Sequence, residues 1–166
     1  LKEFKTLYVK KRKLITKMLN PQGVCRSRQF AFDSLFRDLD ISQAYLKANK
    51  YEKIYWDAFL QVMEASKEMS DFVKKAKKHG LIICAVTDMQ ASFQIAKLKK
   101  LGLSRYFDYL ASSEEAGAEK PNQKIFKLAL EKMQLTKSQV VMIGDNKIKD
   151  IQGAKSFGIK TIHFKA

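Results

Sequence analysis

From about residue 70 to the end of the sequence, short apolar runs alternate with stretches of helical periodicity. The apolar runs are LIICAVT (81–87), FDYLASS (107–113), QVVMIG (139–144) and KTIHF (160–164). Such an alternation predicts a parallel sheet whose strands are joined by helical crossovers on both of its faces. The fold class is therefore α/β. In such a sheet, ligands bind beyond the carboxyl ends of the strands.

The stretches between the apolar runs have the signals of short helices. SDFVKKAKKHG is predicted to start at the capping residue Ser70 and to end at Gly80, and ASFQIAKLKKLG to end at Gly102. Two more helices are expected in NQKIFKLALEKM and IKDIQGAKSFG. Together with the strands, they define an α/β domain over residues 70–166.

The first part of the sequence has helical periodicity only. Apolar residues recur at spacings of three, four and seven in LKEFKTLYVKKRKLITKML, before NPQG breaks the pattern. SRQFAFDSLFRDL and the aromatic-rich QAYLKANKYEKIYWDAFLQVMEA predict two further helices. We therefore expect a small helical domain over residues 1–69. A length of 166 residues suits a compact core with one accessory domain.

Composition limits the partners and the compartment. The net charge of +15 would attract nucleic acid or phosphorylated molecules. We favour solvated lysines on helix faces, because aromatic residues do not interleave with the basic runs and no nucleic-acid-binding signature is present. The apolar runs are too short to span a membrane. Cys25 and Cys84 lack metal-ligand spacing, so we expect reduced thiols and a cytoplasmic protein.

Polar side chains follow three of the predicted strands. Thr87 and Asp88 follow the first, Lys120 lies in the loop after the second, and Asp145 and Asp150 follow the third. Taken singly, these residues are typical of helix caps and solvated surfaces. Together at one edge of a sheet, they suit a phosphoryl group. Carboxylates hold a hard cation such as Mg²⁺, while an ammonium and a hydroxyl hold phosphate oxygens.

The same residues resemble motifs of the haloacid dehalogenase (HAD) superfamily, which consists mostly of phosphatases. AVTD resembles its second motif, a strand that ends in Ser or Thr. EKPNQKIF resembles the third, a lysine before proline and a helix. GDNKIKDIQGAKSFG resembles the fourth, an acidic pair followed by Gly-Ala and a later glycine. The resemblance implies a HAD-like (Rossmannoid) core, with the helical first part as a C1-type cap.

The resemblance also implies a role for each matching residue. Asp145 would ligate Mg²⁺, the implied cofactor, and Asp150 would support the metal shell and the lysine. Lys120 would stabilise the nucleophile and the phosphate. Thr87 would bind a phosphate oxygen, and Asp88 would add a substrate contact.

The cap would select the leaving group, with the basic residues of 10–17 or Arg26 and Arg28 contributing. His79 and His163 have no partner acid or cysteine nearby in sequence, so we expect both to be structural.

One family motif has no counterpart here, the first strand with its catalytic Asp-x-Asp. The nearest match, Asp38 and Asp40 in RDLDIS, follows a stretch of helical period, so we interpret it as a helix end. The core is then expected to lack its first strand. An N-terminal segment outside this sequence, or a second chain, would supply that central strand with the nucleophile.

Two functions remain as hypotheses. The first is a Mg²⁺-dependent phosphatase that hydrolyses a small phosphorylated metabolite, such as a sugar phosphate or a nucleotide monophosphate, through an aspartyl-phosphate. Carbon–halogen hydrolysis fits less well, because Lys120, Asp145 and Asp150 suit a metal–phosphate site. The alternative is a catalytically incomplete HAD-fold module that binds RNA or a protein partner. The acid pair facing a lysine favours the enzyme.

Overall fold

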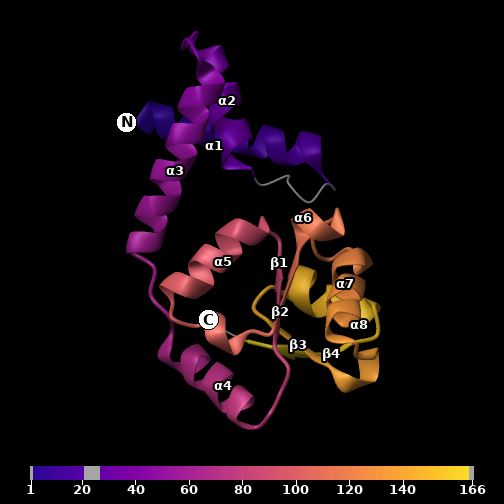
Figure 1. Cartoon of the computed structure of the whole chain (residues 1–166). Coiled ribbons are helices and arrows are strands. Elements are labelled where there is room, and N and C mark those ends of the chain that lie inside the picture. Colours follow the sequence, from indigo (N-terminus) through magenta and orange to yellow (C-terminus); the bar gives the residue numbers. More distant parts are fainter. Residues whose placement is uncertain (1, 21–26, 165–166) are drawn as a thin grey trace. The chain divides into compact units, whose positions relative to one another are not determined.

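The protein is described here by a computed structural model that covers residues 2–20 and 27–164. The chain divides into two compact units (Figure 1), which we call the helical unit (up to residue 64) and the α/β unit (from residue 65). The division falls at Glu64 and Ala65 rather than at the expected 69/70, because the first helix of the α/β unit begins earlier than the sequence pattern suggested.

The helical unit contains three helices, α1 (Lys2–Leu19), α2 (Arg28–Asp38) and α3 (Ala44–Gln61). They follow the three amphipathic stretches of the sequence. Their apolar faces meet in one core, made of Phe32, Leu35, Phe36, Ala44 and Ala48. α1 ends at Leu19, directly before the expected break at NPQG, of which residues 21–23 lie outside the described residues, as do Cys25 and Arg26.

Arg28 is packed among aromatic rings within the helical unit. Its guanidinium carbon lies 4.2 Å from the ring centre of Tyr55 and 4.4 Å from that of Trp56. Its Nη2 donates a hydrogen bond of 3.0 Å to the Tyr55 hydroxyl. These contacts hold α2 against α3, so the Arg28 side chain stabilises the packing of the helical unit.

The Asp-x-Asp sequence lies at a helix end, as we interpreted it. α2 ends at Asp38, and Asp40 has a positive φ of 51°. Asp38 forms an ion pair with Lys11 of α1. Asp38 therefore serves the packing of two helices.

The α/β unit contains four short strands in two parallel pairs. β1 (Cys84–Thr87) pairs with β2 (Tyr109–Ser112), and β3 (Val141–Gly144) pairs with β4 (Lys160–His163). The parallel pairing confirms the α/β prediction. The described residues form two two-stranded sheets, and among them no strand joins β1 to β3.

Helices connect the strands of the α/β unit. They are α4 (Lys67–Lys78), α5 (Ala91–Lys100), α6 (Ser113–Ala116), α7 (Gln123–Met133), the π-helical η3 (Lys147–Gln152) and α8 (Gly153–Ser156), with 3₁₀ turns η1 (Ser104–Tyr106) and η2 (Lys137–Gln139). The predicted cap of α4 was wrong. Ser66, not Ser70, caps this helix, since its hydroxyl accepts the Met69 N–H at 3.1 Å.

The core of the α/β unit forms around α7. Ile125 and Phe126 are fully buried and pack with Ala154 of α8 and with Ile159. Phe126 also stacks on Phe157, with ring centres 6.2 Å apart. This packing holds α7 against the segment that follows β3.

Two further sequence expectations concern Cys84 and membrane spans. Cys84 is a partly buried free thiol, and its burial raises its pKa to about 11, as suits a small core residue. In residues 2–20 and 27–164, no helix is both long and apolar enough to cross a membrane.

An ion pair connects the end of α4 to the beginning of the first sheet. The Nζ of Lys77 lies 2.8 and 2.9 Å from the two carboxylate oxygens of Asp108, and Asp108 also accepts the Ile83 N–H at 2.8 Å. These hydrogen bonds lower the pKa of Asp108, and the one from Lys77 has the larger effect. The ionised carboxylate is therefore the form that stabilises this connection.

Replacing Asp108 with Asn should lower the free energy of unfolding by about 1 kcal/mol at neutral pH. Because the pKa of Asp108 is lower in the folded protein, wild type holds this advantage above the ordinary aspartate pKa of about 3.9 and loses it as the pH falls further. Urea unfolding at several pH values measures the difference. The exposed Asp71→Asn variant is the control, and an Asp108→Asn effect that does not change with pH would contradict the assignment.

Candidate active site

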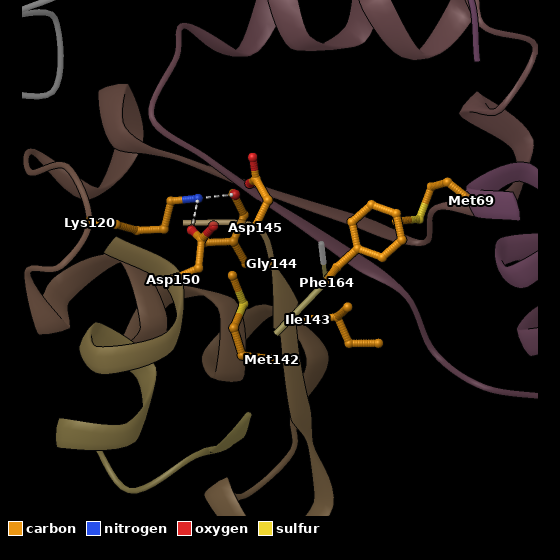
Figure 2. A pocket seen from close by; sticks show the side chains of 9 residues that line it. Met69, Lys120, Met142, Ile143, Gly144, Asp145, Asp150 and Phe164 are labelled. Atoms are coloured by element: carbon orange, nitrogen blue, oxygen red, sulfur yellow. Dashed lines mark hydrogen bonds and ion pairs between the residues drawn. The ribbon is translucent and has the colours of Figure 1, made fainter. Parts of the chain in front are cut away.

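A cavity of about 380 Å³ opens at the carboxyl ends of β1 and β3 (Figure 2). It is lined by Met69, Val86, Lys120, Met142, Ile143, Gly144, Asp145, Asp150 and Phe164. Strands that are far apart in sequence thus bring three of the predicted site residues, Lys120, Asp145 and Asp150, to one place. Thr87 and Asp88 are not among the lining residues.

Lys120 extends from the loop before α7 toward both sheets. Its Nζ donates a hydrogen bond of 2.9 Å to the carbonyl of Val86 in β1 and lies 2.9 Å from Asp150 Oδ1. The side chain is only 11% exposed. An ammonium has three hydrogens, so at least one remains for an anion in the cavity beside these two contacts.

Asp150 is a buried carboxylate, only 5% exposed, that faces Lys120 across the cavity wall (Figure 2). Its Oδ2 accepts the N–H of Asn146 at 3.1 Å. Its Oδ1 accepts no hydrogen bond within the described residues, so its contact with Lys120 is an ion pair of poor hydrogen-bond direction. That oxygen is buried, and the Lys120 ammonium offsets its charge.

Gly144, the last residue of β3, allows Asp150 to approach the strand. A Cβ at this position would lie 2.5 Å from the Asp150 carboxylate. The turn that follows is capped by Asn146, whose side chain accepts the N–H groups of Ile148 and Lys149. Neither acid of the pair is therefore the helix cap, and the glycine and the asparagine together aim Asp150 at Lys120.

Asp145 is the exposed member of the acid pair. Its carboxylate forms no hydrogen bond or ion pair with the rest of the described chain, while its backbone carbonyl lies 2.9 Å from Nε2 of His163. Sequence reasoning treated His163 as structural and missed this contact, which the parallel register of β3 and β4 creates. Asp145 thus offers uncommitted oxygen ligands at the cavity.

Thr87 and Asp88 are engaged elsewhere. The Thr87 hydroxyl donates to Gln94 Oε1 at 3.2 Å. Asp88 Oδ1 accepts the backbone N–H of Lys120 at 2.8 Å, and its Oδ2 accepts from Nζ of Lys149 at 2.8 Å. Their substrate-binding roles stay predictions, and in this structure Asp88 contacts the lysines rather than the cavity.

Lys149 and Glu119 were missed by sequence reasoning. Nζ of Lys149 lies 2.7 Å from Glu119 Oε2 and 2.8 Å from Asp88 Oδ2. Burial alone would lower the pKa of Lys149, but hydrogen bonds to the two carboxylates outweigh it and the pKa is raised. A signal was available in the sequence, because Glu119 directly precedes Lys120 and Lys149 directly precedes Asp150. Each therefore lies next to a predicted site residue of opposite charge.

This arrangement can bind an anion and a cation side by side. Lys120 has a free N–H for the anion, and Asp145 has free oxygens for a hard cation. Within the described ranges, no group of three or more histidine, cysteine or acidic side chains is placed to hold a metal. Mg²⁺ in proteins commonly uses only one or two carboxylates and completes its shell with waters and phosphate oxygens, so Asp145 fits such a site.

Comparison with known proteins identifies the family and the fold. A family model described as haloacid dehalogenase-like hydrolase matches residues 5–164. A ribulose-1,5-bisphosphate 5-phosphatase from Halopiger xanaduensis is 36% identical over 110 residues, which is 66% of this chain and 46% of that protein. A glyceraldehyde 3-phosphate phosphatase from Pyrococcus furiosus is 31% identical over 140 residues, 82% of this chain and 57% of that protein.

A solved structure shares the fold at lower sequence identity. The 2-haloacid dehalogenase from Pseudomonas syringae superposes with a TM-score of 0.78 at 21% identity, covering 96% of this chain and 68% of that one. The chain spans about half the length of the curated relatives that it matches.

Replacing Gly144 with Ala should lower the free energy of unfolding by about 1–3 kcal/mol, because the new Cβ collides with the Asp150 carboxylate. Urea unfolding measures this cost. In an Asp150→Gly background, which removes the Asp150 Cβ as well as the carboxylate, the collision is gone, so the same glycine substitution should cost much less. An equal cost in both backgrounds would show that the glycine is needed for another reason.

Proposed function

The chain belongs to the haloacid dehalogenase-like hydrolase family, and from this premise we propose that it is part of a Mg²⁺-dependent phosphatase for a small phosphorylated metabolite. The observation that carries this proposal is the position of Lys120. Its ammonium is held by Val86 and Asp150, and it faces a cavity that also contains the free carboxylate of Asp145.

The relatives support the reaction and the size of the substrate. Those from Halopiger and Pyrococcus are named for phosphatase activity on small phosphorylated sugars. Lys120 would hold a phosphate oxygen with its remaining N–H, a charge-assisted contact that strengthens as negative charge develops on the transferring group. A sugar phosphate or a nucleotide monophosphate is the substrate class we propose.

The charge of the site supports the proposed Mg²⁺. Around the two lysines, Lys120 and Lys149, lie the four carboxylates Asp88, Glu119, Asp145 and Asp150, so the cluster carries a net charge of −2. A dianionic phosphate would be repelled unless a cation came with it. A Mg²⁺ held by Asp145 would polarise the phosphoryl oxygens and offset this charge.

The nucleophile is proposed to come from a strand between β1 and β3, carried by another part of the protein or by a second chain. Alternate residues of a parallel strand direct their N–H and C=O groups to opposite sides. The Ile83 carbonyl accepts the N–H of Tyr109 in β2, and the Gly144 carbonyl accepts the N–H of Phe164, directly after β4. By this alternation, Val86 and Ile143 direct their N–H and C=O groups away from these partners. A strand between them would place a carboxylate at its end, beside Lys120.

On that strand, the carboxylate would attack phosphorus as the bond to the leaving alcohol breaks. Water would then hydrolyse the aspartyl-phosphate and regenerate the carboxylate. Lys120 would stabilise the nucleophile before the attack and the phosphoryl oxygens during it. Asp150 would keep the ammonium in place.

The proposed strand predicts slow hydrogen exchange at two amides. In the complete protein, the N–H groups of Val86 and Ile143 should exchange as slowly as those of Ala85 and Met142, which face the known partner strands. These two neighbours are internal controls for the local stability of each strand. Exchange of Val86 and Ile143 at rates typical of exposed loops would rule out the strand.

Replacing Asp145 with Ala in the complete protein should lower Mg²⁺-dependent hydrolysis of sugar phosphates by at least about 100-fold, because it removes the cavity carboxylate that has no partner among the described residues. Steady-state release of inorganic phosphate measures this loss. Asp71→Ala, which removes an exposed carboxylate of α4, should keep wild-type turnover. Unchanged Mg²⁺-dependent turnover in the Asp145 variant would refute the proposed metal ligand.

A purely binding role is the weaker proposal. It would rest on the net charge of +15 and would require RNA binding that survives moderate salt. The buried ion pair of Lys120 and Asp150 favours catalysis, since burying two charges is costly and a binding surface has no need of it. We also propose a cytoplasmic location, in keeping with the free thiol of Cys84.

A further inference from the structure

Two dipeptides, each made of one acid and one lysine, face one another beside the cavity, and the lysine of each pairs with the acid of the other. Glu119 directly precedes Lys120, and Lys149 directly precedes Asp150. Lys120 pairs with Asp150 at 2.9 Å, and Lys149 pairs with Glu119 at 2.7 Å. Each peptide segment therefore presents one lysine and one acid to the other. Only the first of these two pairs reaches the cavity.

Asp88 joins the second pair to the backbone of Lys120. Its Oδ2 accepts from Nζ of Lys149, and its Oδ1 accepts the backbone N–H of Lys120 at 2.8 Å. Lys149 is itself anchored, because its backbone N–H donates to Asn146 Oδ1 at 2.9 Å. A single ammonium thus links the loop after β1, the loop before α7 and the turn after β3.

The cluster is sheltered from water. The side chains of Asp88 and Glu119 are 12% and 9% exposed, and that of Lys149 is 27% exposed. Two carboxylates brought this close repel one another unless a cation lies between them. Without Lys149, Asp88 and Glu119 would move apart, and both are connected to Lys120, one by a hydrogen bond and the other by the peptide chain.

We propose that Lys149 is a positioning residue that sets the place of the Lys120 ammonium by holding Asp88 and Glu119 together. The inference rests on the proposed phosphatase function for its kinetic consequence, though not for its structural one. It gives Asp88 a role in the support of Lys120 in place of contact with substrate.

The kinetic test replaces Lys149 with Met in the complete protein, with inorganic phosphate release from a sugar phosphate as the readout. We expect kcat to fall roughly 10- to 100-fold with KM changed by less than about threefold. The reason is that a displaced Lys120 lowers the rate of phosphoryl transfer more than it weakens substrate binding. Lys149→Arg, which keeps the charge and two donors, should recover most of the rate. Lys147→Met, an exposed lysine of the same turn, should match wild type.

A second variant separates positioning from stability. Lys149→Met removes the ammonium between two largely buried carboxylates and should lower the melting temperature. Combining it with Glu119→Gln removes one of these charges, so the melting temperature should rise again. The kcat should stay low, because Asp88 is still not held. A kcat that recovers together with the melting temperature would overturn the positioning role.

A third measurement does not depend on catalysis. Hydrogen exchange of the Lys120 amide should become at least about tenfold faster in Lys149→Met and should stay unchanged in Lys147→Met. A faster amide in a protein without phosphatase activity would refute the proposed function and support the positioning role. An unchanged amide would overturn the positioning role, whether or not the wild-type protein is active.

Discussion

The ion pair between Lys120 and Asp150 is the interaction on which the α/β unit depends. Lys120 is bonded to β1 through the Val86 carbonyl, and Asp150 lies against Gly144 at the end of β3. In the described ranges, no backbone ladder joins these two strands. The two side chains therefore connect one two-stranded sheet to the other at the place where the cavity opens.

Such a pair is a poor source of stability and a good means of positioning. Taking two charges out of water costs about as much as their attraction returns, whereas removing one partner leaves a buried charge that is strongly destabilising. The other groups around the pair reduce this cost. Asn146 donates an N–H to Asp150, and Asp88 accepts the N–H of Lys120, so both members keep their orientation without a ligand.

The charge of the molecule and the charge of the site have opposite signs. The chain carries a net +15, yet the cluster around Lys120 has more carboxylates than lysines. A distant positive potential attracts anionic metabolites, while the local excess of carboxylates suits a divalent cation at the cavity. The two features are therefore compatible with one function, and neither requires nucleic acid as the partner.

Local patterns predicted most of the elements of this protein and the grouping of three of its polar side chains. Four apolar runs formed four parallel strands, and Lys120, Asp145 and Asp150 met at one cavity. The error at the start of α4 was a choice between two local signals. Ser66 and Ser70 are both acceptable caps, and the hydrogen bond to Met69 selected the first.

The sequence by itself determined the order of helices and strands, because apolar periodicity and capping act within a few residues. It also determined which polar residues follow the strands. Only the tertiary structure decided that Asp88 supports Lys120, that His163 contacts Asp145, and that Lys149 joins three separate segments. The physical reason is that the partner of a charged side chain depends on distance and burial, which short-range sequence patterns do not contain.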